Sequence, residues 1–264
     1  MRQILAILLL ISFAFSVTVT EPVGIDVKSG DLIEAGEIGP GQTILITVEP
    51  HVSEGGKFGQ GGDYDLAIPT DLPANWEGKQ SKLYGKPLQI FITAAKDAPE
   101  GEYLANITVQ DANDDRIDEI KFAVKIKITW DVLDIDVTPS EVSVGPGQPA
   151  RYEISITNKG TASDVFDVSS TGLKKWQFKR SVHVPPKSTK TVTYELVEND
   201  EETYNPTIIV SSSASNLIKK EKTVSFKVNT NLVNDYKATN HGVIIMPIFE
   251  SMVYSFIGFI SNLF

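Results

Sequence analysis

The motif Gly-Pro-Gly-Gln occurs twice in this chain of 264 residues, at 39–42 and at 145–148, which are 106 positions apart. Each copy precedes alternating apolar residues, as in a half-buried strand. These residues are Ile44, Ile46 and Val48 in the first copy, and Tyr152, Ile154 and Ile156 in the second. One tryptophan follows each copy at a similar distance, Trp76 and Trp176. A repeat of about 100 residues is too long for a solenoid and is typical of consecutive β-sandwich domains.

The apolar pattern changes its parity between the two copies. Apolar residues occupy even positions as far as Trp130 and odd positions from Leu133 onward, and one sheet face cannot continue through such a change. We therefore expect a first sandwich over residues 18–130 and a second over 131–229, joined strand to strand without a Gly/Ser/Pro linker. Short alternating runs separated by turn signals, without a helical period, predict an all-β fold in both halves.

The chain carries a formal net charge of −10, concentrated in its first half. Residues 18–130 hold 10 Lys/Arg against 19 Asp/Glu, whereas residues 131–229 hold 12 against 13. This balance argues against nucleic acid as a partner, because phosphate binding needs a basic surface. The favoured interpretation of the acidity is a well-hydrated surface, and the alternatives are adaptation to salt and a cationic partner.

No sequence pattern indicates a reaction centre. The absence of cysteine excludes a disulfide framework, a thiolate zinc site and a thiol nucleophile. His51, His183 and His241 are far apart and match no metal-ligand spacing. No Gly-x-Ser-x-Gly elbow is present. We therefore expect a chain without catalytic residues or cofactors, and not an enzyme.

Residues 1–16 have the features of a secretory signal peptide. Arg2 precedes an apolar run over 4–11, and small residues at Ala14 and Ser16 fit a cleavage site. The alternative is an uncleaved N-terminal anchor, for which the apolar run is short.

The C-terminal residues 242–264 predict a membrane helix that contacts lipid. Their only charged residue is Glu250. A helix of about 22 residues reaches about 33 Å, enough to cross a hydrocarbon core of about 30 Å. The alternative is a helix that lies in the membrane interface. With residues 230–241 as a polar tether, we expect an exported, membrane-anchored protein with both domains outside the cytoplasm.

Small and polar residues form one stripe of this predicted helix. Ser251, Ser255, Gly258 and Asn262 fall within an arc of roughly 60° on a helix. Small residues let helices approach closely in lipid, so the stripe predicts a homo-oligomer or a partner span. The alternative is the polar edge of an interfacial helix.

Two candidate sites lie in the last hairpin expected for the first domain. Asn106-Ile107-Thr108 is an N-glycosylation sequon whose asparagine should face solvent. The acidic tip that follows offers Asp111, Asn113 and Asp115 as oxygen ligands for Ca²⁺. Because the glycine and terminal glutamate spacing of an EF-hand loop are missing, we expect a solvated turn without metal.

The two tryptophans have two interpretations. Trp76 and Trp176 could be stacking platforms for a sugar, but equivalent positions in two repeats favour core anchors. A platform needs an accessible ring face, so exposure separates the two interpretations.

Several short motifs resemble one class of prokaryotic domain. Gly-Pro-Gly-Gln, the strand at 152–156 and the turn at 157–160 look like the opening of Ig-like modules in bacterial and archaeal proteins. These include the NPCBM-associated α-galactosidase-type domain and the CARDB type. In the first copy, residues 73–76 and 98–103 resemble further motifs of these modules. The second copy departs at Trp176, which no proline precedes, and has 202–204 in place of the glycine turn.

The resemblance covers about 200 residues and implies a pair of Ig-like β-sandwiches. It further implies a non-catalytic cell-surface or envelope protein that acts as a stalk, an adhesion component or an interaction module for a protein or glycan partner. The alternative is an accessory carbohydrate-binding subunit that works with a separate enzyme. Glycan-array binding by residues 18–229 would separate the two.

Overall fold

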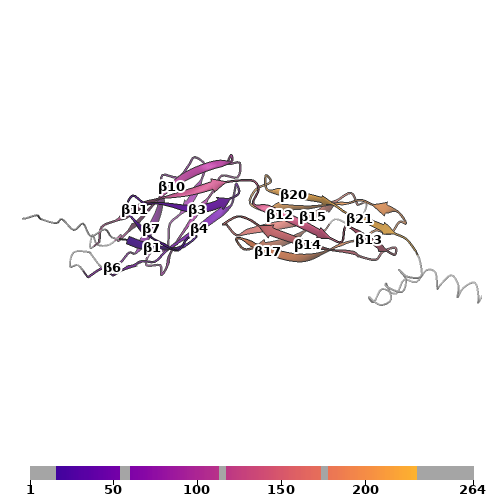
Figure 1. The fold of residues 1–264 in the computed structure, drawn as a ribbon, viewed down its shortest axis with the longest axis horizontal. Helices are drawn as coiled ribbons and strands as arrows, with labels where there is room; N and C mark the ends of the chain where they lie inside the picture. Colours follow the sequence, from indigo (N-terminus) through magenta and orange to yellow (C-terminus); the bar gives the residue numbers. More distant parts are fainter. Residues whose placement is uncertain (1–15, 54–59, 113–116, 174–177, 231–264) are drawn as a thin grey trace, which may run out of the picture. The chain divides into compact units, whose positions relative to one another are not determined.

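The computed structural model describes residues 16–53, 60–112, 117–173 and 178–230. These residues form β-strands and no helix, which confirms the all-β prediction (Figure 1). The contacts divide the chain after Thr129 into a first unit and a second unit. Most of the predicted signal peptide and the whole predicted membrane helix lie outside the described residues.

The first unit has two main sheets. The five-stranded sheet has the order β2-β1-β4-β9-β8, and its strands are Ile25–Lys28, Ser16–Glu21, Thr43–Val48, Leu88–Thr93 and Glu77–Lys79. The four-stranded sheet has the order β3-β11-β10-β7, with strands Leu32–Ile38, Ile120–Ile128, Gly101–Gln110 and Leu66–Thr70. A short hairpin pairs β5 (His51–Val52) with β6 (Gly62–Asp63).

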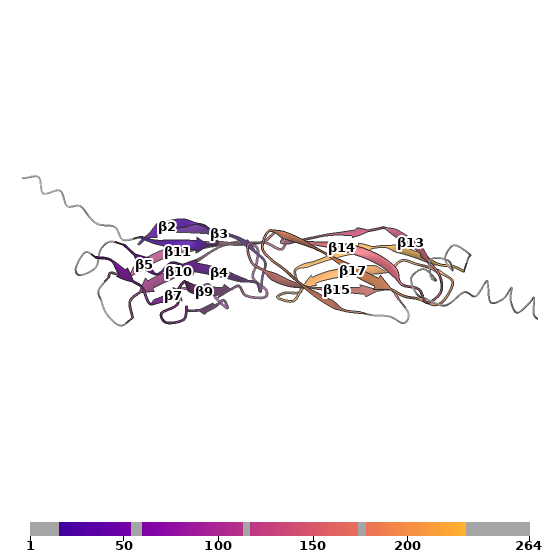
Figure 2. The same cartoon turned by 90° about the horizontal axis from the view of Figure 1, so that it is seen from below.

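Alternate residues of these two sheets form the core of the first unit. The five-stranded sheet buries Ile44, Ile46, Val48, Leu88, Ile90 and Ile92, and the four-stranded sheet buries Ile107, Val109, Phe122, Val124 and Ile126. Period-two patterning thus gives each sheet one buried face, as in a β-sandwich. The pairing of β4 with β9 can be followed in Figure 2.

The second unit divides its strands among three sheets. The first has the order β12-β14-β17, with strands Leu133–Thr138, Ala150–Asn158 and Ser188–Leu196. The next has the order β16-β15-β19-β20, with strands Arg180–Val184, Asp164–Thr171, Thr207–Ser212 and Lys219–Thr223. The last has the order β13-β21-β18, with strands Glu141–Val144, Ser225–Val228 and Thr203–Tyr204.

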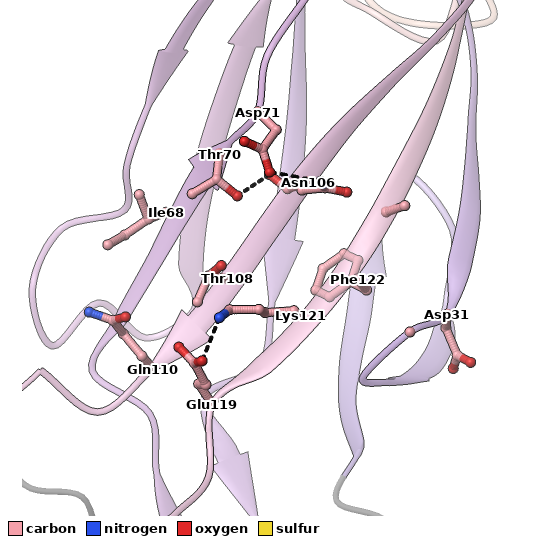
Figure 3. Close-up of a pocket in the computed structure, with 12 residues that line it drawn as sticks. Asp31, Ile68, Thr70, Asp71, Asn106, Thr108, Gln110, Glu119, Lys121 and Phe122 are labelled. Carbon is pink, nitrogen blue, oxygen red and sulfur yellow. Dashed lines mark hydrogen bonds and ion pairs between the residues drawn. The ribbon is translucent and has the colours of Figure 1, made fainter.

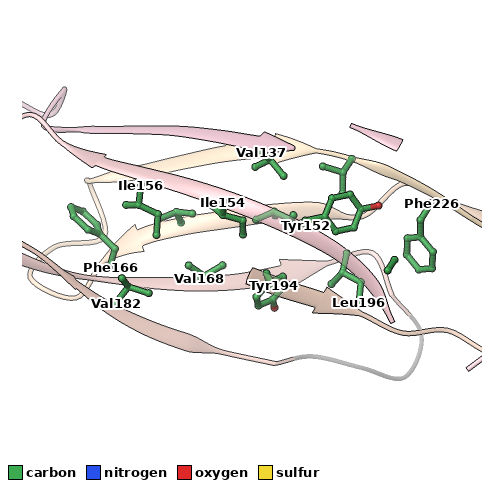
Figure 4. Packing of buried hydrophobic residues seen from close by; sticks show 14 of the residues in the cluster. Val137, Tyr152, Ile154, Ile156, Phe166, Val168, Val182, Tyr194, Leu196 and Phe226 are labelled. Atoms are coloured by element: carbon green, nitrogen blue, oxygen red, sulfur yellow. The ribbon is translucent and has the colours of Figure 1, made fainter. Parts of the chain in front are cut away.

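Aromatic side chains fill the core of the second unit (Figure 4). Tyr152, Tyr194, Phe166 and Phe226 are all fully buried. Each buried tyrosine still satisfies its hydroxyl. Tyr152 donates to the carbonyl of Ser225 at 2.9 Å. Tyr194 donates its single proton to the Phe178 carbonyl, and its oxygen lies 3.3 Å from the Ser170 hydroxyl, which can donate to it. Burial raises the pKa of both phenols, so both remain neutral donors at ordinary pH.

Both units begin with the same crossover between sheets. In the first unit, β1 pairs antiparallel with β4, and β3 then pairs parallel with β11. In the second unit, β12 pairs antiparallel with β14, and β13 then pairs parallel with β21. The opening segment of each unit therefore contributes to both layers of its sandwich.

The two Gly-Pro-Gly-Gln motifs form the same turn. Gln42 N–H donates to the Gly39 carbonyl at 3.2 Å and Gln148 N–H to that of Gly145 at 3.1 Å. The φ angles of Gly41 and Gly147 are 71° and 70°. Proline followed by a residue with positive φ fits a type II turn. The buried glutamine side chain accepts from the first glycine N–H, at 2.7 Å in the first unit and 3.3 Å in the second.

Both units also share a tyrosine at a chain corner. Tyr103 Oη donates to the Pro99 carbonyl at 3.0 Å, and Tyr204 Oη donates to the Asp200 carbonyl at 3.1 Å. In each case the tyrosine reaches back four residues just before or within the strand that enters the sheet centre. The sequence departure at 202–204 therefore keeps this corner.

Two predicted strands differ from the structure. The loose alternation over 19–27 predicts one opening strand, whereas the structure has two paired strands, β1 and β2, because Pro22 interrupts the run and the chain folds back. The alternation over 223–228 likewise predicts one strand, whereas the structure ends β20 at Thr223 and begins β21 at Ser225. The chain changes sheets between them, because β20 pairs with β19 and β21 pairs with β13 and β18.

Candidate functional site

The outer face of the four-stranded sheet of the first unit carries an open groove of about 590 Å³. We call it the β10 groove; it runs along the outward side chains Asn106, Thr108 and Gln110 of β10 (Figure 3). The opposite face of β10 buries Ile107 and Val109 in the core. Strand periodicity alone therefore places these three polar side chains in one row.

Neighbouring strands supply the walls of the groove. Thr108 lies between Ile68 of β7 and Lys121 of β11, and it is only 6% exposed although it faces outward. Asn106 lies between Thr70 and Ala123 in the same way. The small side chains of Thr108 and Ala123 therefore form a floor below longer neighbours.

Hydrogen bonds fix the polar groups at both ends of the groove. Asn106 Nδ2 donates to Asp71 Oδ2 at 3.0 Å, and Asp71 has the positive φ of 49°. At the other end, Lys121 Nζ lies 2.5 Å from Glu119 Oε1. The lining also includes Asp31, so carboxylates outnumber cations. The groove therefore disfavours an anion.

Exposed ion pairs cover the rest of this sheet face. Lys125 Nζ lies 2.6 Å from Glu34 Oε1, and Lys127 Nζ lies 2.7 Å from Glu37 Oε1. Hydrogen bonds to these carboxylates raise the pKa of both lysines. Such surface pairs contribute little to stability and mark a solvated face.

Trp76 does not present its ring to solvent. The residue is 8% exposed, and its ring centroid lies 5.2 Å from that of Tyr103. This geometry favours the core-anchor interpretation over a sugar-stacking platform, which needs an open face. Trp176 lies outside the described residues.

Protein groups hold the base of the acidic hairpin. Asp65 Oδ1 accepts from the Ala112 N–H at 2.6 Å, and Tyr64 Oη donates to the Asp118 carbonyl at 2.7 Å. Burial, and then the nearby Asp118 charge, raise the pKa of Tyr64 to about 12. Asp111 follows directly after β10, whereas Asn113 and Asp115 lie outside the described residues.

Among the described residues, no group of three or more His, Asp or Glu side chains is placed to hold a metal ion. His51 Nδ1 lies 2.8 Å from Asp63, to which Lys86 also donates, while His183 is on β16. Hydrogen bonds from Lys86 and then from His51 hold the pKa of Asp63 below its ordinary value. His241 lies outside the described part of the chain.

The second unit has its own semi-buried carboxylate, Asp167 on the outer face of β15. Lys179 Nζ lies 2.8 Å from it, and the hydroxyls of Ser181 and Ser213 donate to it at 2.6 and 3.1 Å. Burial acts to raise the pKa of Asp167, but these three donors outweigh it and hold the pKa below the ordinary value. These contacts tie β15 to β16 and to the residues next to β16 and β19, which is a structural role.

The predicted contact stripe, Ser251, Ser255, Gly258 and Asn262, lies outside the described residues. Within the described ranges, no helix is long and apolar enough to cross a membrane.

Sequence reasoning identified Asn106 but missed most of its surroundings. Asp71 and Lys121 come from segments distant in sequence, and the chain gives no motif around either. The available signal was the small, outward Ala123 on a strand with otherwise charged outward residues, which marks a gap on the sheet face.

No protein-family model matches the chain, and no curated protein matches it. Among solved structures, chimeric titin Z1Z2 carrying a KLER peptide from decorin has 9% identity and a TM-score of 0.36, covering 83% of this chain and 99% of that chain. The human seminal-plasma complex of zinc α2-glycoprotein and prolactin-inducible protein has 13% identity and a TM-score of 0.30, covering 38% and 95%. A β-glucosidase from Listeria innocua has 17% identity and a TM-score of 0.26, covering 36% and 16%. Likenesses this low carry no argument about function.

Proposed function

We propose that the chain is an exported, membrane-anchored and non-catalytic protein of two Ig-like domains that acts as a surface stalk or interaction module. The observation that carries this proposal is the repetition of one corner design in both units. Each unit has the Gly-Pro-Gly-Gln turn, the crossover of its opening segment and a tyrosine corner. A tyrosine corner at this place is a hallmark of Ig-like sandwiches.

The strand arrangement of the first unit supports the same proposal. In their order across the sheet, β1, β4, β9 and β8 are neighbours in one sheet, and β7, β10 and β11 are neighbours in the other. This is the distribution of strands A, B, E and D against C, F and G in a constant-type immunoglobulin domain. The motifs resembling NPCBM-associated and CARDB-type modules agree with it. Such domains present loops and faces for binding, and a membrane helix at 242–264 would hold them at the surface.

Membrane extraction and surface labelling test the proposal. The full chain, expressed with its own N-terminal segment, should remain in the membrane at alkaline pH and react with a membrane-impermeant lysine reagent on intact cells. A chain ending at His241 should be released. Release of the full chain, or labelling only after lysis, would contradict the proposal.

The contact stripe is tested separately. Replacing Ser255 and Gly258 with leucine should keep the chain in the membrane and reduce crosslinked dimers, since close helix approach requires small residues. Unchanged crosslinking would assign the stripe to a polar edge.

A further inference from the structure

We infer that the β10 groove is a carbohydrate site occupied by the chain's own N-linked glycan, attached at Asn106. The inference rests on the proposed function, since attachment requires export. The attached sugar lies against the protein instead of extending into solvent.

The sequon itself lies along the β10 groove. Asn106 and Thr108 both point outward from β10, and both line the groove. The acceptor asparagine is therefore at one end of the hollow, and the hydroxyl residue of the same sequon forms its floor (Figure 3).

The groove leaves space for a glycan beside Asn106. Asn106 is half-buried between Thr70 of β7 and Ala123 of β11. A glycan on a half-buried asparagine needs open space beside it, and the groove supplies about 590 Å³. The Nδ2 atom has two hydrogens, and the attachment replaces one with the anomeric carbon of the sugar. The lipid-linked phosphate donor leaves, and the displaced proton passes to solvent. The remaining N–H can still donate to Asp71, now 3.0 Å away.

The walls of the groove offer the polar and apolar groups that a sugar can contact. Gln110 and Lys121 offer donors, Glu119 offers acceptors, and Ile68 and Ala123 offer apolar contact for sugar C–H groups. The excess of carboxylates disfavours uronic or phosphorylated sugars and admits neutral N-acetylated ones.

Attachment must precede folding. Thr108 is 6% exposed and the Asn106 amide is bound to Asp71 in the folded unit. A transferase that reads both residues therefore reaches them only before β10 pairs with β7 and β11.

A lysine footprint tests the inference on the full chain displayed at the surface of a eukaryotic host cell. Lys121 lines the groove, whereas Lys127 is on the same strand outside it; their side chains are 61% and 53% exposed, and each is paired with a glutamate. Compared with the Asn106→Gln variant, the glycosylated chain should show several-fold slower acetylation of Lys121 and unchanged acetylation of Lys127.

A shifted sequon is the matched control. Leu104→Asn together with Asn106→Thr moves the sequon two residues along the same face, to a position that is 56% exposed and outside the groove lining. This variant should carry a glycan and leave Lys121 as reactive as in the unglycosylated chain. Equal labelling of Lys121 with and without the native glycan would overturn the inference, as would a glycan on the shifted sequon but none at Asn106. If neither sequon is occupied although the chain reacts with the impermeant lysine reagent on intact cells, the inference falls and the proposed function stands. If the chain reacts only after lysis, the proposed function falls.

Discussion

The two units share the Gly-Pro-Gly-Gln turn and the tyrosine corner but differ in the strand that follows β7 in the first unit and β15 in the second. In the first unit this strand joins the other sheet, and in the second it stays in the same sheet. In the first unit, β8 crosses from β7 to the five-stranded sheet and pairs with β9. In the second, β16 folds back and pairs with β15 in the same sheet. The free edge of β17 therefore pairs with no strand in the described part of the second unit. The Arg180 guanidinium of β16 donates there to the Thr193 carbonyl at 2.8 Å. The same fold skeleton thus accepts two different edges.

Local packing accounts for the difference. After β7, Asp71 and Asn75 adopt positive φ, and Trp76 packs against Tyr103 before the chain passes Gly78. A Cβ on Gly78 would lie 2.6 Å from Leu72 and 2.7 Å from Pro69, so only glycine allows this crossing. In the second unit, the chain after β15 turns at Gly172, whose φ is 89°.

Truncation of a buried ring should have the largest effect on the stability of either unit. Phe122→Ala in the first unit and Phe166→Ala in the second should each lower the free energy of unfolding of their own unit by about 3–5 kcal/mol, because both rings are buried. Hydrogen exchange resolved by peptide should rise in the mutated unit alone. A rise in both units would show that they unfold together.

Gly78→Ala should destabilise the first unit by about 1–3 kcal/mol, because its methyl group overlaps the rigid ring of Pro69. Gly24→Ala is the control, since a Cβ there has no atom within 4 Å. Urea unfolding measures both variants. Equal midpoints for the two would argue that the crossing does not depend on Gly78.

The shared turn should be stronger in the first unit. Gln42→Ala and Gln148→Ala each remove the acceptor of a glycine N–H, a loss of about 1–3 kcal/mol for a buried group. Because the bond is 2.7 Å long in the first unit and 3.3 Å in the second, Gln42→Ala should cost more. Thermal unfolding of the single variants tests the order, and a larger loss from Gln148→Ala would reverse it.

Loss of the corner hydroxyl should have a smaller effect. Tyr103→Phe and Tyr204→Phe keep the ring contacts with Trp76 and Phe226 and remove one hydrogen bond, worth about 0.5–1.5 kcal/mol. Tyr204 is the more deeply buried, so its variant should lose more stability. Urea midpoints should show both losses, and no loss in either variant would leave the corners without an energetic role.

Acid sensitivity should give the smallest difference. The pKa values of Asp63 and Asp167 are lowered in the folded chain, so their contribution is present above the unfolded pKa of about 3.9 and is lost as the pH falls through the folded pKa. Lys86→Met and Lys179→Met should each reduce the loss of stability between about pH 6 and about pH 3 by under about 1 kcal/mol. Asp167 is the less exposed carboxylate, so Lys179→Met should have the larger effect. A change of the opposite sign would contradict the assigned ion pairs.

The sequence by itself determined the features that depend on neighbours along the chain. Gly-Pro-Gly-Gln specifies its turn because proline sets one φ and glycine permits the next to be positive. Alternation at 44–48 and 152–156 specifies strands with one buried face, and β4 and β14 contain these residues. Asn106 was placed on the outward face by the same periodicity.

Tertiary structure alone decided the features that depend on distant segments. In the first unit, β8 joins β9 because of the packing between Gly78, Leu72 and Pro69. In the second unit, β16 returns and pairs with β15. The β10 groove exists because β7, β10 and β11 bring Ile68, Thr108 and Lys121 side by side from separate parts of the chain. The strands β3 and β13 form by parallel pairing with the last strand of each unit, a contact that no local pattern encodes.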